Sequence, residues 1–258
     1  ILSAKIKLKN IESAYIRQES IKAENLNEIF RLFEESEDWT YTVAWIDCLQ
    51  KGKNIGRSIL MRGEHALKVE LPFKLADKPL RLKKKFSPTV PFYFPKFVLN
   101  KFTVKAFNFL YFNKQRPKVV KNIIDYETFF YPLDAINDWN RIYGKSGFIQ
   151  YQMVIPKEKG EEGMRRILET IANSGQGSFL AVLKLFGKNN PLAYNSFPFE
   201  GYTLALDFKL NRELVQLVNN LDKIVEEFGG RIYLTKDSMS KSSLTNYLKN
   251  VESSKFTS

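Results

Sequence analysis

The chain has 258 residues, of which 44% are hydrophobic and 26% are charged, and its formal net charge is +12 at neutral pH. This composition supports a buried core and excludes a disordered tail or a coiled coil. No stretch reaches the roughly 18 apolar residues of a membrane span, and the first residues lack a signal-peptide pattern. One cysteine, Cys48, and one histidine, His65, exclude an internal disulfide and argue against a zinc site. We interpret both residues as structural and expect no metal.

The positive charge is concentrated in one segment. Residues 81–120 hold ten lysines and arginines and no acidic residue, so they supply +10 of the net +12. The same segment contains ten aromatic residues and four prolines. Such a combination of cations and aromatic rings indicates an interaction surface, whose partner has to be inferred from its context.

The first part of the chain predicts a β-α-β-β unit. Residues 14–19 alternate between apolar and polar side chains, as a half-buried strand does. A helix follows, because apolar residues recur at 3.6-residue spacing between Leu26 and Phe33 and glutamates occupy the other side. Residues 41–47 and 57–63 are then predicted to form two strands joined by a loop.

A similar pattern returns after residues 81–120 and a turn or short helix at 133–143. The predicted elements are, in order, a strand at 147–156, a helix at 161–175 that stops at Gly175, strands at 178–187 and 201–208, a helix that begins at an Asn211 cap and ends at 229–230, and a final strand and turn at 231–238. Two such units with sequential strands predict an α+β fold, with an antiparallel sheet covered by helices on one face.

Three residues in these strands suggest ligand chemistry. Gln150 and Gln152 share one face of their strand, which is either plain solvent-facing surface or a floor that hydrogen-bonds a polyhydroxylated ligand. Lys184 lies in a row with Val182 and Phe186, where a lysine either extends to the edge of the sheet or meets an anion. None of the common nucleophile, phosphate-loop or dinucleotide motifs occurs. These patterns alone leave the activity open.

The strands and their connections resemble a known family over nearly the whole chain. The chain resembles the substrate, or cap, domain of the decaprenylphosphoryl-β-D-ribose oxidase family. The members of this family are FAD-linked oxidases of the vanillyl-alcohol-oxidase type. The matching stretches are ILSAKI, YTVAWIDCLQKGKNIGRSILMRG, FFYPLDAINDWNRIYGKSGFIQYQMVIP, SFLAVLKLFG, FPFEGYTLALDF and FGGRIYLTKDS. Taken together these stretches are specific, whereas residues 66–120 match only loosely.

The resemblance implies a domain organisation. Residues 1–235 would form the cap domain, with a basic-aromatic insertion at 66–120 that is partly disordered, and residues 236–258 would begin the return to an FAD-binding domain. The chain opens on Ile1 rather than methionine, so we expect a piece of a longer protein whose FAD-binding domain precedes ILSAKI. The chain alone is then expected to bind FAD poorly and to be inactive.

The resemblance also implies site residues. Lys236 is expected to be the catalytic lysine at the flavin and the substrate, and Tyr233 the aromatic residue beside the flavin. The positions that match the substrate pocket of the family are Trp45, Phe130, Gln150, Gln152, Lys184, Phe186, Thr203 and Ala205. Arg141 matches a supporting arginine. Phe130, Thr203 and Ala205 stand where the mycobacterial enzymes have tyrosine, asparagine and cysteine, which leaves the identity of the sugar open.

The chemistry implied by the resemblance is FAD-dependent oxidation of a sugar secondary alcohol, with a polyprenyl-phosphate-linked pentose as the expected substrate and cell-wall biosynthesis as the setting. Lys236 would stabilise negative charge on reduced flavin or bind the substrate phosphate. Lys184 and the amides of Gln150 and Gln152 would orient the sugar. No catalytic base is evident in the chain, and we expect the absent domain to supply it.

Two other functions stay open. A sugar-lactone oxidase of the same flavin superfamily shares the cap architecture, and only product analysis separates it from an oxidase of a polyprenyl-phosphate-linked sugar. A nucleic-acid-binding module would explain the charge and aromatic residues of 81–120, but the prolines and the lack of an RNA-recognition strand signature make it the less favoured alternative.

The segment 81–120 has two further interpretations. It binds an anionic membrane surface, from which a polyprenyl-phosphate substrate would be drawn, or forms a mobile loop over the substrate pocket, or does both. We therefore expect a cytoplasmic or membrane-surface-associated protein.

Overall fold

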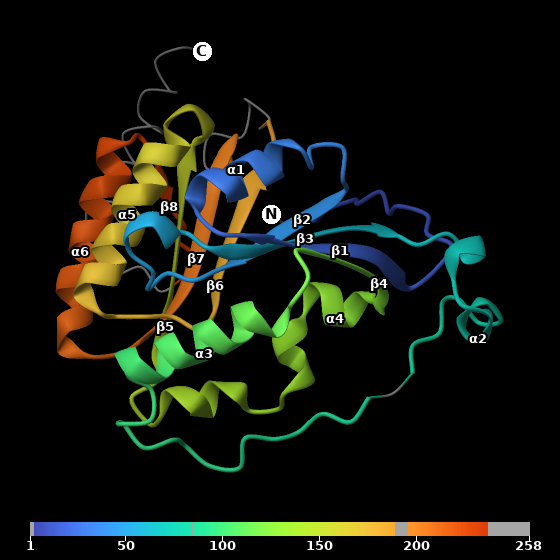
Figure 1. The fold of residues 1–258 in the computed structure, drawn as a ribbon, viewed down its shortest axis with the longest axis horizontal. Helices are drawn as coiled ribbons and strands as arrows, with labels where there is room; N and C mark the ends of the chain where they lie inside the picture. The colour runs from blue at the N-terminus through green and yellow to red at the C-terminus, as the bar shows by residue number, and fades with distance from the viewer. Residues whose placement is uncertain (1–2, 84, 189–195, 237–258) are drawn as a thin grey trace.

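The computed structural model describes residues 3–83, 85–188 and 196–236, which build one antiparallel sheet flanked by helices (Figure 1). The strands are β1 (Tyr15–Ala23), β2 (Tyr41–Ile46), β3 (Ser58–His65), β4 (Val119–Asp125), β5 (Phe148–Pro156), β6 (Ala181–Phe186), β7 (Gly201–Lys209) and β8 (Arg231–Ile232). They lie in the order β4-β1-β3-β2-β6-β7-β5-β8, and each neighbouring pair is antiparallel. The predicted α+β class is therefore confirmed.

The sheet is made of two halves with the same topology. The first half is β1, α1 (Leu26–Glu34), β2 and β3, and the second is β5, α5 (Gly160–Ser174), β6 and β7. Each half places its third strand between the other two, and the halves meet where β2 pairs with β6 at Ala44↔Leu183 and Trp45↔Val182. The two predicted β-α-β-β units thus form one continuous sheet.

Three amphipathic helices cover one face of this sheet: α1, α5 and α6 (Arg212–Glu227). Their apolar sides are buried, as at Phe33, Ile167 and Leu221, because apolar residues recur once per turn. The predicted ends are confirmed: the Asn211 side chain accepts a hydrogen bond from the backbone of Leu214, and Gly175 ends α5 in the left-handed conformation that favours glycine.

The opposite face is also partly covered, and this corrects the expectation of helices on one face only. Helix α3 (Lys101–Lys114) packs Phe112 against Trp45 and Ile59, in a cluster separate from the main core. Since successive residues of a strand point to opposite faces, Trp45 faces away from α1, α5 and α6, whereas its neighbour Ala44 faces them. Helix α3 was missed because it is apolar on several sides and therefore has no clear helical periodicity.

A buried polar cluster holds α3 in place. The carboxylate of Asp47, 1% exposed, accepts hydrogen bonds from the Arg57 guanidinium at 2.9 and 3.1 Å. Its other oxygen accepts from the side-chain amide of Asn108 on α3, at 2.8 Å. Both Asn108 and Arg57 are buried. The hydrogen bonds that the Arg57 guanidinium and the Asn108 amide nitrogen donate to one buried carboxylate favour a single arrangement, which fixes the position of α3 on the sheet.

The insertion at 66–120 contains regular structure. It includes α2 (Phe73–Ala76), α3 and the first residues of β4, which pairs with β1 and was missed in the sequence. The backbone amides of Val90 and Phe94 donate to the carbonyls of Asn137 and Arg141, so the irregular part follows the chain just before β5. The remaining short elements are α4 (Tyr126–Phe130), η1 (Gly52–Asn54), η2 (Lys68–Glu70), η3 (Pro132–Ala135), η4 (Trp139–Tyr143) and η5 (Lys157–Lys159).

The predicted final strand and turn, at 231–238, begin as strand β8, which has two residues and is followed by a turn. The rest of the prediction, at 237–238, lies outside the described residues. The same holds for 237–258, the predicted return to a second domain, and for Lys84 of the basic segment. Among the helices of the described ranges, none combines the length and the apolar character needed to cross a bilayer.

Candidate functional site

The register of the sheet brings several predicted site residues onto one face. Gln152 pairs with Ala205, Ala205 with Val182, and Val182 with Trp45, so these side chains form one row across β5, β7, β6 and β2. Directly opposed residues of paired strands share a face. In the adjacent row, Lys184 pairs with Thr203. This is the face opposite α1, α5 and α6.

Lys236 joins this face through the turn that follows β8. The backbone amide of Tyr233 donates to the carbonyl of Gln152, at 2.8 Å, and the amide of Lys236 donates to the carbonyl of Tyr233, at 3.2 Å. These bonds place the Lys236 ammonium beside strand β5, where it donates to the side-chain oxygen of Gln150 at 3.0 Å. Residues 86 positions apart in the sequence therefore meet at one point.

The buried hydroxyl of Thr203 positions the side chain of Gln152. This hydroxyl donates to the carbonyl of Met153, at 2.8 Å, and accepts from the Gln152 side-chain amide, at 3.2 Å. Thr203 is only 2% exposed, whereas Gln152 is half-buried. The threonine therefore sets the orientation of the amide and has little surface of its own for a ligand.

An aromatic group borders the polar residues. The ring of Tyr233 stacks on Phe197, with centroids 4.5 Å apart, and Phe197 meets Phe186 edge to face at 6.1 Å. Phe197 thus connects two predicted site residues, and it was missed in the sequence. The signal was its place in the matched stretch FPFEGYTLALDF, just before β7.

Trp45 and Phe130 lie on the same face but under or beside other elements. Trp45 is 5% exposed, because the Tyr111 ring of α3 lies 4.6 Å from it, and its indole nitrogen donates to the carbonyl of Phe179. Phe130, at 39% exposure, packs edge to face on Tyr41. Access of a ligand to Trp45 would therefore require α3 to move.

Arg141 supports the insertion. Its guanidinium donates to the carbonyl of Val90, at 2.9 Å, and pairs with Asp138 at 3.2 Å. The backbone carbonyl of Arg141 accepts from Phe94. These contacts hold the segment around 90–94 against η4.

A buried carboxylate, Asp207, lies opposite Gln150 in the register of β5 and β7. It is 3% exposed and lies near Tyr143, which is 1% exposed. Burial, together with the charge of Asp207, raises the pKa of Tyr143 far above its usual range. Asp207 was not singled out in the sequence. Its burial places it in the interior rather than on the open part of the face.

The side chains of Gln150, Gln152, Lys184 and Lys236 form a polar surface that is accessible to solvent, the open wall. Lys184 is exposed, and Gln150, Gln152, Phe186 and Ala205 are half-buried. Amides and lysines can bind the hydroxyl groups of a polyol or a phosphate. Because this surface is open, a second surface is needed to exclude water from a bound ligand.

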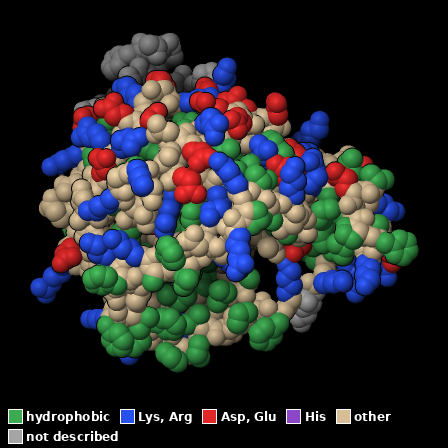
Figure 2. All heavy atoms as spheres, viewed as in Figure 1, with side chains coloured by type: hydrophobic (Ala, Val, Ile, Leu, Met, Phe, Trp, Pro, Cys, Tyr) green, Lys and Arg blue, Asp and Glu red, His purple; other side chains and the backbone are tan. Residues whose placement is uncertain are grey.

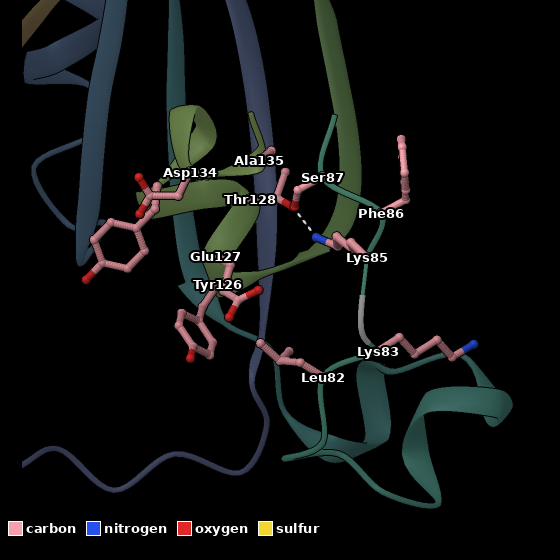
Figure 3. A pocket seen from close by; sticks show the side chains of 11 residues that line it. Leu82, Lys83, Lys85, Phe86, Ser87, Tyr126, Glu127, Thr128, Asp134 and Ala135 are labelled. Carbon is pink, nitrogen blue, oxygen red and sulfur yellow. Dashed lines mark hydrogen bonds between the residues drawn. The ribbon is translucent and has the colours of Figure 1, made fainter. Parts of the chain in front are cut away.

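A separate pocket of about 520 Å³ lies between α4 and residues 82, 83 and 85–87 (Figure 3). The Lys85 ammonium in this pocket donates to Thr128 and also pairs with Asp125. Burial raises the pKa of Asp125, but the hydrogen bonds from Lys85 and Thr128 outweigh it and leave that pKa below its usual value. The residues that line this pocket include none of the predicted site positions.

The reactivity of the buried Cys48 tests how tightly the core of the sheet is packed. Cys48 is fully buried, and although a backbone hydrogen bond from Ser178 acts in the other direction, burial raises the pKa of its thiol to about 12. The thiolate is the reactive form. We expect Ellman's reagent to leave the native chain unmodified during the time in which it modifies the urea-unfolded chain completely. Immediate modification of the native chain would contradict this packing.

Comparison with known proteins gives the relationship. No family model matches the chain. It is 38% identical to decaprenylphosphoryl-beta-D-ribose oxidase of Mycolicibacterium smegmatis over 92% of its own length and 52% of that protein. It is 24% identical to an uncharacterized protein in the mprA 5' region of Streptomyces coelicolor, over 92% of this chain and 66% of that one.

Among solved structures, an unknown protein from Galdieria sulphuraria covers 87% of this chain and 99% of its own, at 11% identity and a TM-score of 0.26, which is too low to support an argument. The chain spans about half the length of the M. smegmatis enzyme. At 38% identity over 92% of its residues, this chain is a homologue of decaprenylphosphoryl-β-D-ribose oxidase, as the sequence motifs predicted.

Proposed function

We propose that this chain is the substrate-binding part of an FAD-dependent oxidoreductase that oxidises a secondary alcohol of a polyprenyl-phosphate-linked pentose. The observation that carries the proposal is the contact between Lys236 and Gln150 on an open polar sheet face, in a chain 38% identical to an oxidase of such a substrate. The contact brings a cation and an amide to one point from distant parts of the sequence.

The residues of the face have complementary roles in this proposal. The amides of Gln150 and Gln152 offer donors and acceptors to sugar hydroxyls, and Thr203 holds the second amide in place. Lys184, exposed within an otherwise apolar strand, is suited to the substrate phosphate. Together they would fix the reacting carbon relative to the rest of the enzyme.

In this proposal, FAD binds at the edge of the same face. Lys236 and Tyr233 are half-buried and lie at the edge of the sheet, beside the open wall, where they can contact a large planar group. FAD, when bound, would accept the hydride from the alcohol. Lys236 would stabilise negative charge at its edge. Because Asp207 is buried, we assign the proton acceptor to a part of the enzyme outside this chain.

The proposal is tested with the full-length, FAD-loaded protein under anaerobic conditions. We expect decaprenylphosphoryl-β-D-ribose to bleach the flavin absorbance and to yield a keto sugar, while decaprenyl phosphate without a sugar leaves the flavin oxidised. Bleaching by an aldonolactone but not by the lipid-linked ribose would favour the lactone oxidase instead. Bleaching by neither compound would refute both functions.

A further inference from the structure

Helix α3 has two apolar faces. Val104, Asn108 and Phe112 are buried against the sheet and its edge, at four-residue spacing. On the outer side, Phe102 is 80% exposed, Phe109 56% and Leu110 67%. Large apolar side chains exposed on the outer side of a helix indicate that a partner covers that side. The outer face of α3 is thus a surface without a partner among the described residues.

This outer face is displayed by a firmly attached helix. Asn108 is bound to the buried Asp47, and the Phe112 ring lies 5.0 Å from the Arg57 guanidinium. Tyr111 packs on Trp45. The side chains that hold α3 differ from those that it exposes, so the exposed rings are not explained by the attachment of the helix.

The apolar surface continues beyond α3. Phe97, at 76% exposure, and Phe92, at 61%, precede the helix. Figure 2 shows hydrophobic side chains gathered along the lower part of the molecule, over α3 and the segment beside it. We call the exposed side chains of Phe92, Phe97, Phe102, Phe109 and Leu110 the α3 patch. Contiguous exposed apolar surface of this kind marks an interaction site.

A cationic cleft borders the α3 patch where the helix begins. It has a volume of about 620 Å³ and is lined by Lys96, Lys101, Lys209 and Arg212, with Glu213 as its acidic residue. The Lys209 ammonium donates to the backbone carbonyls of Lys96 and Leu99, and burial, followed by the nearby charge of Lys96, lowers its pKa. Four cations against one carboxylate leave the cleft with a net positive charge, which favours an anionic ligand.

The charge of the segment decides between possible partners. Because residues 81–120 hold ten basic residues and no acid, a second copy of this face would meet it with the same sign of charge. An anionic bilayer offers the complementary arrangement, with phosphates for the lysines and an interfacial layer for the aromatic rings. We propose that the α3 patch docks on the surface of an anionic lipid bilayer, with headgroup phosphates in the cationic cleft. This inference does not depend on the proposed oxidase activity.

The experiment measures cosedimentation of the full-length protein with vesicles of phosphatidylcholine, with or without phosphatidylglycerol. We expect binding only to the anionic vesicles, and weakening by 0.5 M salt. The variant Phe102→Ser/Phe109→Ser/Leu110→Ser should bind at least about tenfold more weakly. So should Lys96→Glu/Lys101→Glu/Arg212→Glu, because each cation near such a surface adds to the attraction.

Two matched variants serve as controls. Ile6→Ser/Leu8→Ser/Val215→Ser removes three exposed apolar side chains elsewhere, and Lys53→Glu/Lys68→Glu/Lys223→Glu reverses three exposed charges outside the cleft. Circular dichroism and thermal unfolding verify that every variant is folded.

Binding by the controls at the wild-type level, with loss in both test variants, supports the proposal. No binding, equal binding to neutral vesicles, or full binding by the Phe102 triple variant overturns it. So does a change in oligomeric state of that variant in sedimentation velocity, which would assign the patch to a second copy. Binding by this chain but not by the full-length protein would show that the rest of the protein covers the patch, and would also overturn it.

Discussion

Replacing Lys236 with alanine is expected to slow flavin reduction by the substrate at least about 100-fold, the usual effect of removing one preorganised charge-stabilising group. The reason is that the Lys236 ammonium reaches the polar face beside Gln150, at 3.0 Å, from a turn outside the core. Because the turn is half-exposed, the variant should fold normally. Anaerobic stopped-flow measurement of flavin bleaching in the full-length enzyme gives the rate.

Two further variants make this result specific. Lys236→Arg keeps the charge and should recover part of the rate, and Lys223→Ala removes an exposed lysine of α6, on the other side of the sheet, and should have no effect. A wild-type rate in Lys236→Ala would show that the lysine has no role in the reaction. An equal loss in Lys223→Ala would show a general effect of removing positive charge.

Replacing Asp47 with alanine is expected to lower the free energy of unfolding by about 3–5 kcal/mol. The change leaves the Arg57 guanidinium, 7% exposed, without its carboxylate and removes the acceptor of the Asn108 amide. Breaking one partner of a buried ion pair is costly because the other charge stays buried. Urea unfolding followed by circular dichroism measures the loss.

Controls separate the ion pair from the loss of a side chain. Asp38→Ala, at an exposed position, should change stability by less than about 0.5 kcal/mol. Asn108→Ala removes a hydrogen bond but no charge, so its cost should be smaller, about 1–3 kcal/mol. If Asp47→Ala were as stable as Asp38→Ala, the cluster would not be what holds α3 on the sheet.

The local sequence pattern was sufficient to predict most strands of the sheet and the helices α1, α5 and α6 that cover one of its faces. The helix between Leu26 and Phe33 and the ends at Gly175 and Asn211 depend on periodicity and capping within a few residues. Strand β4 was missed because its pairing with β1 joins residues far apart in the sequence, such as Tyr15 and Asp125. The final strand, predicted together with a turn at 231–238, has only two residues, because only Arg231 and Ile232 of its described residues pair with β5.

The residues of the candidate site were proposed from the sequence, but their arrangement in space was not predictable from it. Motif similarity pointed to Gln150, Gln152 and Lys236, and the alternation of a strand already placed the two glutamines on one face. It could not show that Thr203 is buried under Gln152, or that Phe197 joins Tyr233 to Phe186. These facts depend on the register between strands and on a turn after β8.

The sequence by itself therefore determined the α+β class, the repeated units and the relationship to the oxidase, because local periodicity and linear motifs carry that information. Only the tertiary structure decided that α3 covers the second face and leaves its own outer face exposed. The apolar residues of α3 lie on several sides of the helix, so they follow no helical period that would orient it. Its orientation comes from the bond between Asn108 and Asp47, across 61 residues, and such long-range contacts exist only in the folded chain.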